Sequence, residues 1–351
     1  MSRNSQSNSF LRNTAFLASM AALTGCLFAG AARAADVTLR IEHLMAPIAP
    51  LQKKVLEPWC RQLADDSRGR IACEIYPAMQ LGGTPAQLAD LTKNGVIDIA
   101  WTVPGYTAGR FPVLEAMELP FVVKDAVSGS RAAWEFYRAH AQKELDAYKV
   151  LAISMDGGMA LHTSSKKIAS PDDIKGLKLR ASGRMMAKTL SALGANTVAM
   201  PTPQITDAVS KGVIDGLLGA WELIIPFKLD EVTKYHVDPP AGAPFPASAV
   251  VMLIMNKEKY NSMPDDLKAV LDRNSGEFLV NMFGKVWEEA TFEGRAKVKA
   301  SGGEIVSFSA RDMETMKAAT KSVEDEWIRE MTEKGHDGKA LAAAARAFGA
   351  K

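Results

Sequence analysis

Apolar and polar residues follow two different periods along the chain, and the change from one to the other marks the ends of the predicted elements. Alternation predicts strands at 37–43, 71–76 and 96–102, whereas helical spacing predicts helices at 51–64 and 85–93. The order strand, helix, strand, helix, strand is typical of a doubly wound parallel sheet with helices on its faces.

A second α/β unit of similar size follows the first. A strand at 149–155 and the Asp-Gly-Gly sequence at 156–158, where the chain can bend, lead into it. In this unit we predict strands at 159–164, 176–180 and 196–200, and helices at 185–193 and 203–211. The later helix at 278–298 has large apolar residues on more than one side, as expected if it lies against both units.

The first 34 residues have the composition of a removable secretory leader. Arg3 and Arg12 precede or flank an apolar run, and Ala-Arg-Ala at 32–34 is a small-residue cleavage site, so we expect a mature periplasmic protein of a Gram-negative bacterium. The Leu-Thr-Gly-Cys sequence ending at Cys26 leaves lipidation as an alternative. No later stretch reaches about 18 uninterrupted apolar residues, so we expect no stable membrane insertion.

Composition and charge narrow the class of protein further. With 351 residues, of which 47% are hydrophobic, the chain is long enough for two domains with separate cores. Its formal net charge is +2, and removal of the three leader arginines changes this to −1. Such a balance argues against nucleic-acid binding, which needs a strongly basic surface.

Two cysteines, Cys60 and Cys73, remain after the leader is removed. Their positions on a predicted helix and on the following strand direct both side chains toward one core. In an oxidising compartment we expect a disulfide between them, with two buried free thiols as the alternative.

Arg180 is the candidate anion-binding residue. It stands at the carboxyl end of the strand predicted at 176–180, directly before the Ala-Ser-Gly loop that contains Ser182. Ligands of open α/β sheets bind outside the carboxyl ends of strands, and a planar guanidinium suits a carboxylate. From these residues alone, a surface arginine at the end of a strand is the alternative.

Candidate pocket walls come from aromatic residues near predicted strand ends and interdomain turns. The loop at 103–112 is rich in Gly, Pro and aromatic residues and follows a strand directly. The aromatic candidates are Trp101, Tyr106, Trp221 and Phe245, and each is equally explained as a core residue. His162 is either a hydrogen-bonding ligand contact or a structural histidine.

No catalytic or metal-binding pattern occurs in the sequence. None of the five histidines lies two to five residues from another His or Cys, and nucleophile-elbow, zinc-protease, Walker and dinucleotide fingerprints are missing. Asp172 and Asp173 are typical helix-start acids, and Asp215 is a typical turn residue. We therefore expect a protein that is not an enzyme and uses no cofactor or metal.

Five motifs resemble, in order and spacing, the solute-binding subunits of tripartite ATP-independent periplasmic (TRAP) transporters, the dicarboxylate-type binding protein family. They are Tyr-Pro at 76–77 with Gln-Leu-Gly-Gly at 80–83, Asn-Gly-Val-Ile-Asp-Ile-Ala at 94–100, Glu-Leu-Pro-Phe at 118–121, Asp-Asp-Ile-Lys-Gly-Leu-Lys-Leu-Arg at 172–180 and Lys-Gly-Val-Ile-Asp-Gly at 211–216. The resemblance covers nearly the whole chain. It implies a periplasmic-binding-protein-like α/β fold, with two domains around a central cleft, hinge strands and a long helix spanning both domains.

The resemblance also implies a domain division and a way of working. We predict a first domain at 35–157 plus 246–285 and a second at 158–245 plus 286–351, including the C-terminal helices, after the signal peptide at 1–34. The family closes on its ligand and delivers it to membrane subunits driven by an ion gradient. Arg180 falls on the family's arginine that pairs with a substrate carboxylate.

Departures from the family pattern suggest which acid is bound. Leu218 and Gly219 replace a Glu-Asn pair of many relatives, Ala160 replaces a second arginine, and Val103 and Tyr106 replace charged wall residues. We therefore expect an organic monocarboxylate with an apolar or aromatic body. The expected ligand contacts are Arg180, Trp221, Tyr106, Trp101, Val103, His162, Ser182, Gly219, Phe245 and His43.

Three alternatives remain open at this point. A small C4-type dicarboxylate would need a further basic residue in the cleft, and the sequence offers no obvious one. The chain could instead present its ligand to a membrane kinase as a sensor, or act as an exported hydrolase or lyase.

Overall fold

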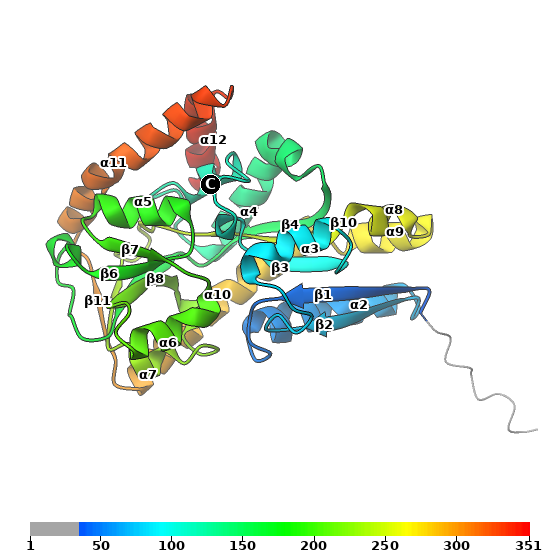
Figure 1. Cartoon of the computed structure of the whole chain (residues 1–351), viewed down its shortest axis with the longest axis horizontal. Helices are drawn as coiled ribbons and strands as arrows, with labels where there is room; N and C mark the ends of the chain where they lie inside the picture. Colours follow the sequence, from blue (N-terminus) through cyan, green and yellow to red (C-terminus); the bar gives the residue numbers. More distant parts are fainter. Residues whose placement is uncertain (1–34) are drawn as a thin grey trace, which may run out of the picture.

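The computed structural model describes residues 35–351, so the predicted signal peptide and both of its candidate cleavage sites lie outside the described residues. Two β-sheets, each covered by helices, form two lobes that lie side by side (Figure 1). The α/β class with two sheet-centred units, which the sequence predicted, is confirmed.

The first lobe is built on a five-stranded sheet in the order β2-β1-β3-β10-β4. Its strands are β1 (Val37–His43), β2 (Ile71–Tyr76), β3 (Ile99–Thr102), β4 (Tyr148–Met155) and β10 (Val250–Asn256). β1 is parallel to β2 and β3, as predicted, but β10 is antiparallel to β3 and β4. The parallel arrangement predicted for the first three strands is therefore confirmed, and β10, which returns from the second lobe, adds an antiparallel strand to the sheet.

Helices of the first lobe cover this sheet. They are α2 (Glu57–Asp66), α3 (Leu88–Lys93), α4 (Ala126–Phe136), α8 (Lys257–Ser262) and α9 (Asp265–Arg273).

The second lobe is built on a six-stranded sheet in the order β11-β9-β5-β8-β6-β7. Its strands are β5 (Met159–Thr163), β6 (Lys178–Ala181), β7 (Asn196–Ala199), β8 (Gly216–Ala220), β9 (Tyr235–Asp238) and β11 (Glu304–Ser307). Its helices are α5 (Arg184–Ala192), α6 (Ile205–Ser210), α7 (Leu229–Val232) and α11 (Ala310–Glu333). β9 and β11, with the sequences Tyr-His-Val-Asp and Glu-Ile-Val-Ser, were not predicted.

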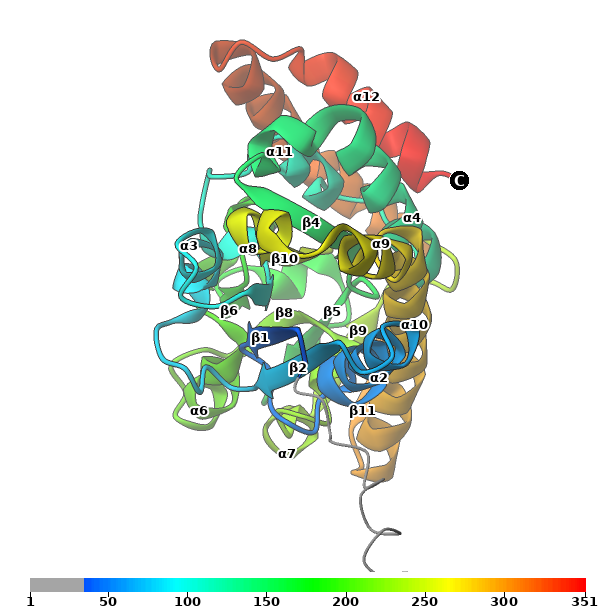
Figure 2. The same ribbon diagram turned by 90° about the vertical axis from the view of Figure 1, so that its right-hand side faces the viewer.

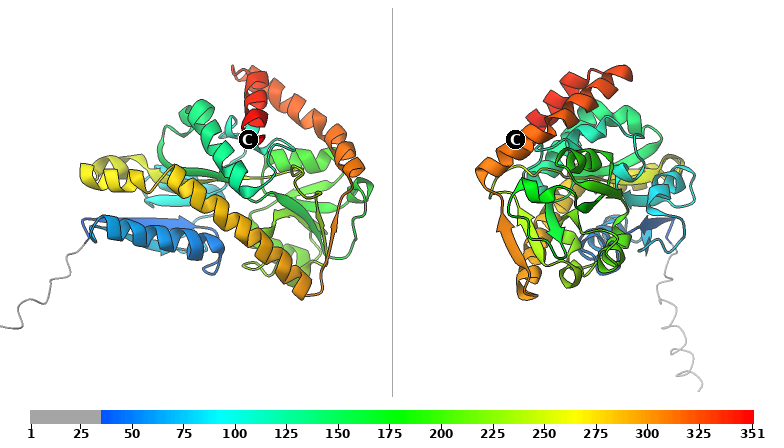
Figure 3. Two further views of the ribbon diagram at one scale, coloured as in Figure 1. Left: turned by 180° about the vertical axis from the view of Figure 1, so that it is seen from behind. Right: turned by 60° about the vertical axis from the view of Figure 1, so that its left-hand side comes forward.

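Before the C-terminal helices, the described chain crosses between the lobes at residues 156–158, at residues 239–249 and along helix α10 (Glu277–Ala300). α10 packs against α4 and β4 of the first lobe and against β11 of the second, so the predicted helix spanning both units is confirmed. Figure 3 shows it from behind, running diagonally across both lobes.

Glycines let these crossing segments approach one another. A Cβ on Gly157 would lie 2.5 Å from Thr291 Oγ1 of α10, and one on Gly158 would lie 2.1 Å from the Phe245 ring. Gly158 also has a φ of 83°, which favours glycine. The crossing therefore depends on these two glycines for close packing.

A buried carboxyl group joins two of the crossing segments. Asp156 Oδ1 accepts a hydrogen bond from the Gly158 amide (3.1 Å), and Oδ2 accepts one from the Ala249 amide (3.1 Å). Backbone bonds between Asp156 and Ala249 and between Met159 and Ala247, both 3.1 Å, run beside them. The two strands that link the lobes are thus held together where the chain bends.

The C-terminal helices also contact both lobes. α11 packs against α5 of the second lobe. α12 (Gly338–Gly349) packs against α4 of the first lobe (Figure 2). The two sheets fall within the predicted domain ranges, but α12 lies on the first lobe although the range 286–351 assigns it to the second. The division itself stays a prediction. None of the helices described is long and apolar enough to cross a membrane.

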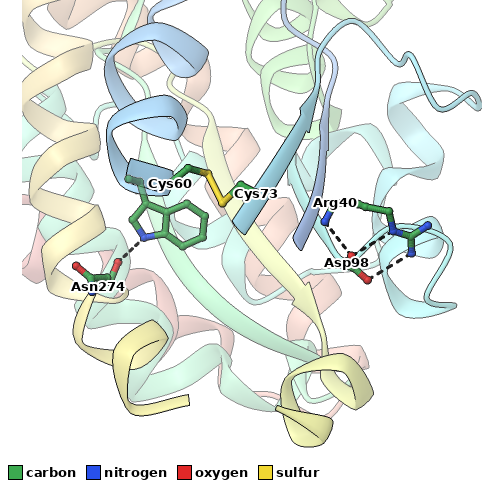
Figure 4. Close-up of a disulfide and its surroundings, with 6 residues drawn as sticks. Arg40, Cys60, Cys73, Asp98 and Asn274 are labelled. Carbon is green, nitrogen blue, oxygen red and sulfur yellow. Dashed lines mark hydrogen bonds and ion pairs between the residues drawn. A yellow bond between two sulfur atoms is a disulfide. The ribbon is translucent and has the colours of Figure 1, made fainter. Parts of the chain in front are cut away.

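Cys60 on α2 and Cys73 on β2 form a disulfide, as expected from the sequence (Figure 4). The bond joins residues 13 positions apart, with their Cα atoms 5.8 Å from each other. Next to it, the Trp59 indole donates a hydrogen bond to the Asn274 carbonyl (2.7 Å), which ties α2 to the turn before α10. The disulfide therefore stabilises the edge of the first lobe on which α10 rests.

Replacing both cysteines by alanine should lower the free energy of unfolding by about 3 kcal/mol, the chain-entropy value for a loop of this length. Urea unfolding of the oxidised protein and of the double variant measures the difference. A reducing agent should destabilise the wild type alone, and equal stability of the two proteins would contradict the prediction.

Candidate functional site

Arg180 is buried in the second lobe, on β6, and is only 1% exposed. Its Nε donates a hydrogen bond to the Met200 carbonyl (3.0 Å), and Nη2 donates one to Thr202 Oγ1 (3.3 Å). No carboxylate among residues 35–351 lies within ion-pair distance of it. Burial lowers the pKa of Arg180, which shows the cost of holding this charge away from water. The surface alternative for this arginine is therefore wrong.

Tyr106 connects the first lobe to the same site. Its hydroxyl lies 3.0 Å from Thr202 Oγ1 and accepts a hydrogen bond from the Thr202 amide (3.3 Å). One residue earlier, a Cβ on Gly105 would lie 3.2 Å from the Gly183 Cα, directly after β6. Since β3 leads into this loop, the first lobe touches the second beside Arg180, which means that the lobes are closed on each other.

A narrow cavity marks the interface between the lobes further out. It has a volume of about 130 Å³. Its lining residues are Leu44, Ala78, Met79 and Pro85 of the first lobe and Pro201, Pro203 and Gln204 of the second. A larger cavity of about 630 Å³ lies between α10 and residues 238–245, but Arg180, Tyr106 and Trp101 do not line it. The candidate ligand site is therefore the region between the lobes beside Arg180, and the larger cavity is separate from it.

Three buried carboxyl groups surround the crossing segments: Glu118, Asp156 and Glu222. Burial raises the pKa of Glu118 to about 8, and it raises the pKa of Asp156, against the opposing effect of backbone donors and of Arg180. Burial and the Asp156 charge together raise the pKa of Glu222. Because these groups favour the neutral form, they supply little negative charge to balance Arg180.

Trp101 and His43 lie together at the carboxyl ends of β3 and β1, where they are register partners. Both are buried, as is Val103, and the Trp101 ring lies 6.2 Å from that of Trp287 on α10. His43 Nδ1 accepts a hydrogen bond from the Met45 amide (3.2 Å), and burial lowers the pKa of His43 to about 4. The first lobe thus presents apolar and neutral side chains at this edge.

His162, Gly219 and Trp221 form an interior cluster of the second lobe. His162 Nε2 lies 2.9 Å from the Gly219 carbonyl, and its Nδ1 lies 2.8 Å from Nδ1 of His236. The Trp221 indole donates to Asp238 (2.7 Å). The polar atoms of His162 and Trp221 are therefore engaged by the protein, and their predicted contact with a ligand could involve only ring surface.

Two more predicted contacts have roles that the structure makes visible. Ser182 is buried next to Met186, whose sulfur lies 3.4 Å from the Ser182 amide. Phe245 packs on Gly158, and its backbone pairs with residues 121 and 123 of the first lobe. Phe245 therefore belongs to the crossing segments.

Sequence reasoning missed Thr202 and Trp287. Thr202 lies in the Pro-Thr-Pro sequence after β7, the parallel neighbour of β6, so the carboxyl-end argument that singled out Arg180 applies to it as well. Trp287 looked like one of many apolar residues of a long helix, and only the packing shows that it meets Trp101.

Two sheet-centred lobes that close around a buried, unpaired guanidinium define a two-lobed solute-binding protein. The chain belongs to bacterial extracellular solute-binding protein family 7, the TRAP solute-binding proteins, whose family match covers residues 41–330. The family is one of transport binding proteins and includes periplasmic members.

Solved structures and a curated relative agree with this assignment. A TRAP solute-binding protein of Rhodoferax ferrireducens T118 in complex with copurified benzoate is 40% identical, with a TM-score of 0.87 over 89% of this chain and 97% of that one. A marine metagenome protein specific for aromatic acid ligands, in complex with 3-hydroxybenzoate, is 39% identical, with a TM-score of 0.88 over 90% and 99%. The C4-dicarboxylate-binding periplasmic protein DctP of Rhodobacter capsulatus is 24% identical over 84% of this chain and 87% of its own length.

Replacing Glu118 by Gln should stabilise the protein at alkaline pH. The folded-state pKa of Glu118, about 8, lies above its ordinary value of 4.5, so wild-type stability should fall as the pH rises through this window. Glu115 and Asp156 raise this pKa further, whereas Arg184 lowers it. The amide keeps an oxygen for the Val250 amide, which now donates to Glu118 Oε1 (3.0 Å).

Thermal unfolding at pH 5, 7 and 9 checks this prediction. The difference in Tm between Glu118→Gln and wild type should grow with pH. The free energy of unfolding of the variant should exceed that of the wild type by on the order of 2 kcal/mol at pH 9. Glu258→Gln on the exposed α8 serves as the matched control and should show no such trend. A difference that does not change with pH would contradict the assignment.

Proposed function

We propose that this protein is exported to the periplasm, captures an aromatic or otherwise apolar monocarboxylate by closure of its two lobes, and delivers it to TRAP membrane subunits. The observation that carries the proposal is Arg180, a fully buried cation with no ion-pair partner among residues 35–351. A buried charge of this kind is costly unless a counterion accompanies it. A ligand carboxylate would be that counterion, and it would form a bidentate pair with the guanidinium.

The groups around Arg180 favour one carboxylate and an apolar body. Trp101 and Val103 at the end of β3 carry no charge, and burial favours the neutral forms of the buried carboxyl groups. Arg184, the next arginine along the chain, is held by Glu115 and Glu330 and has no free charge for a second carboxylate. These contacts support a monocarboxylate over the C4-type dicarboxylate.

The comparisons support the same ligand class. Two structures close to 40% identical to this chain hold benzoate and 3-hydroxybenzoate, and the TM-scores of 0.87 and 0.88 extend over nearly the whole chain. The C4-dicarboxylate-binding relative is only 24% identical. Export through the leader at 1–34 and transfer to ion-gradient-driven membrane subunits belong to the proposal, because they rest on the leader composition and on the family.

Replacing Arg180 should remove affinity without unfolding the protein. Arg180→Met should weaken benzoate binding by about 10 to 150 fold, since a charge-assisted pair contributes about 1.5 to 3 kcal/mol. The ligand-free variant should be about as stable as the wild type, because it removes a buried charge that has no ion-pair partner.

Calorimetric titration of benzoate and succinate, after co-purified acid has been removed by unfolding and refolding, measures the effect. The wild type should prefer benzoate. Arg138→Met, at an arginine whose side chain is 59% exposed, is the control and should bind as the wild type does. Unchanged benzoate affinity in folded Arg180→Met would rule out the proposed carboxylate pair.

A further inference from the structure

Two indole N–H groups near the interlobe site have no hydrogen-bond acceptor. They belong to Trp101 at the end of β3 and to Trp287 on α10, which are 5% and 1% exposed. Neither Nε1 atom has a partner among residues 35–351. The two rings lie 6.2 Å apart at an angle of 60°, so both unpaired donors belong to one place in the fold.

Three other indoles of the described residues have acceptors, whereas the N–H of the half-buried Trp134 on α4 has none. Trp59 donates to the Asn274 carbonyl (2.7 Å), Trp221 to Asp238 (2.7 Å) and Trp327 to the Pro112 carbonyl (3.2 Å). Indole nitrogen can only donate, and a buried donor without an acceptor loses free energy comparable to a missing hydrogen bond. The unpaired donors of Trp101 and Trp287 are therefore a feature that needs a reason.

Trp101 lies on the strand that leads to the contact between the first lobe and the Arg180 site, and Trp287 packs on Trp101. β3 leads from Trp101 directly into the loop of Tyr106, whose hydroxyl meets Thr202 and, through it, Arg180. The backbone of α10 at Trp287 lies against the crossing segment, since a Cβ on Gly157 would be 3.8 Å from the Trp287 carbonyl oxygen. An acid that places its carboxylate on Arg180 would extend its body toward the first lobe and these two donors.

His43, the register partner of Trp101, is a third unpaired group, but it has a neighbour that can serve it. Since its Nδ1 accepts from the Met45 amide, the neutral ring carries its proton on Nε2. Gln52, whose Oε1 also lacks a partner, interacts with His43, and this oxygen can accept a hydrogen bond from the Nε2 proton. The argument therefore rests on the two indoles alone.

We propose that the bound acid carries a hydrogen-bond acceptor on its body, such as a ring hydroxyl or ether oxygen, and that Trp101 and Trp287 donate to it. The two residues then select hydroxy- or alkoxy-substituted aromatic acids over methyl-substituted acids of the same shape. A site built to hydrogen-bond a substituent discriminates against the analogue that lacks it, because the donors are then left unpaired in a dry site. This inference rests on the proposed function, since it names a further feature of the acid that Arg180 binds.

Calorimetry with matched acids tests the selection. Benzoate is compared with its 3- and 4-hydroxy, methoxy and methyl derivatives on ligand-free wild-type protein. The best hydroxy or methoxy acid should bind about tenfold or more tightly than the methyl acid substituted at the same position. Trp101→Phe and Trp287→Phe keep an aromatic ring without the donor, and each should move this ratio toward one while benzoate affinity changes less.

Two controls make the outcome interpretable. Trp134→Phe removes a buried, unpaired indole N–H on α4, among the residues lining a different pocket, and should leave the ratio unchanged. Arg180→Met should weaken every acid in the series alike. If acids bind in an Arg180-dependent way but the wild type shows the same affinity for oxygen and methyl substituents at each position, the donor proposal is overturned and the proposed function stands. If no acid binds through Arg180, the proposed function itself fails.

Discussion

A guanidinium that is buried without a carboxylate partner is the constraint on which the rest of this structure depends. Arg180 donates to the Met200 carbonyl and to Thr202, with Tyr106 beside it, although burial disfavours its charge. A protein selected for stability alone would pair or replace such a group. The unpaired charge is explained if its partner arrives from outside, as it does in a binding protein whose ligand is an anion.

The segments that cross between the lobes link the need of Arg180 for a counterion to the arrangement of the two lobes. Tyr106 of the first lobe contacts Thr202 beside Arg180, so both lobes contribute to the site in this arrangement. Gly157 and Gly158 let the crossing strands pack against α10 and Phe245, and Asp156 ties these strands together. A ligand that touches both lobes would stabilise closure by as much as its contacts differ between the two states.

Sequence periodicity predicted most of this architecture, because long apolar patterns reflect burial against a sheet or helix. It located β1, β2, the spanning helix α10 and the position of Arg180, and the cysteine positions indicated the disulfide. It missed β9 and β11, whose few residues depend on neighbouring strands, and the antiparallel direction of β10, which no local pattern encodes. Sequence periodicity also did not predict which side chains contact each other. The sequence predicted Trp221 as a pocket residue, but its indole donates a hydrogen bond to Asp238. The contact between Trp287 and Trp101 follows only from the packing of α10.

The central claim is that the carboxylate of a bound acid supplies the counterion that Arg180 lacks. A crystal structure of the protein in complex with benzoate tests it most directly. The account predicts both carboxylate oxygens about 2.7 to 2.9 Å from guanidinium nitrogens of Arg180, with the ring between the two lobes. A benzoate whose carboxylate pairs with another basic residue, while Arg180 keeps only Met200 and Thr202, would contradict it.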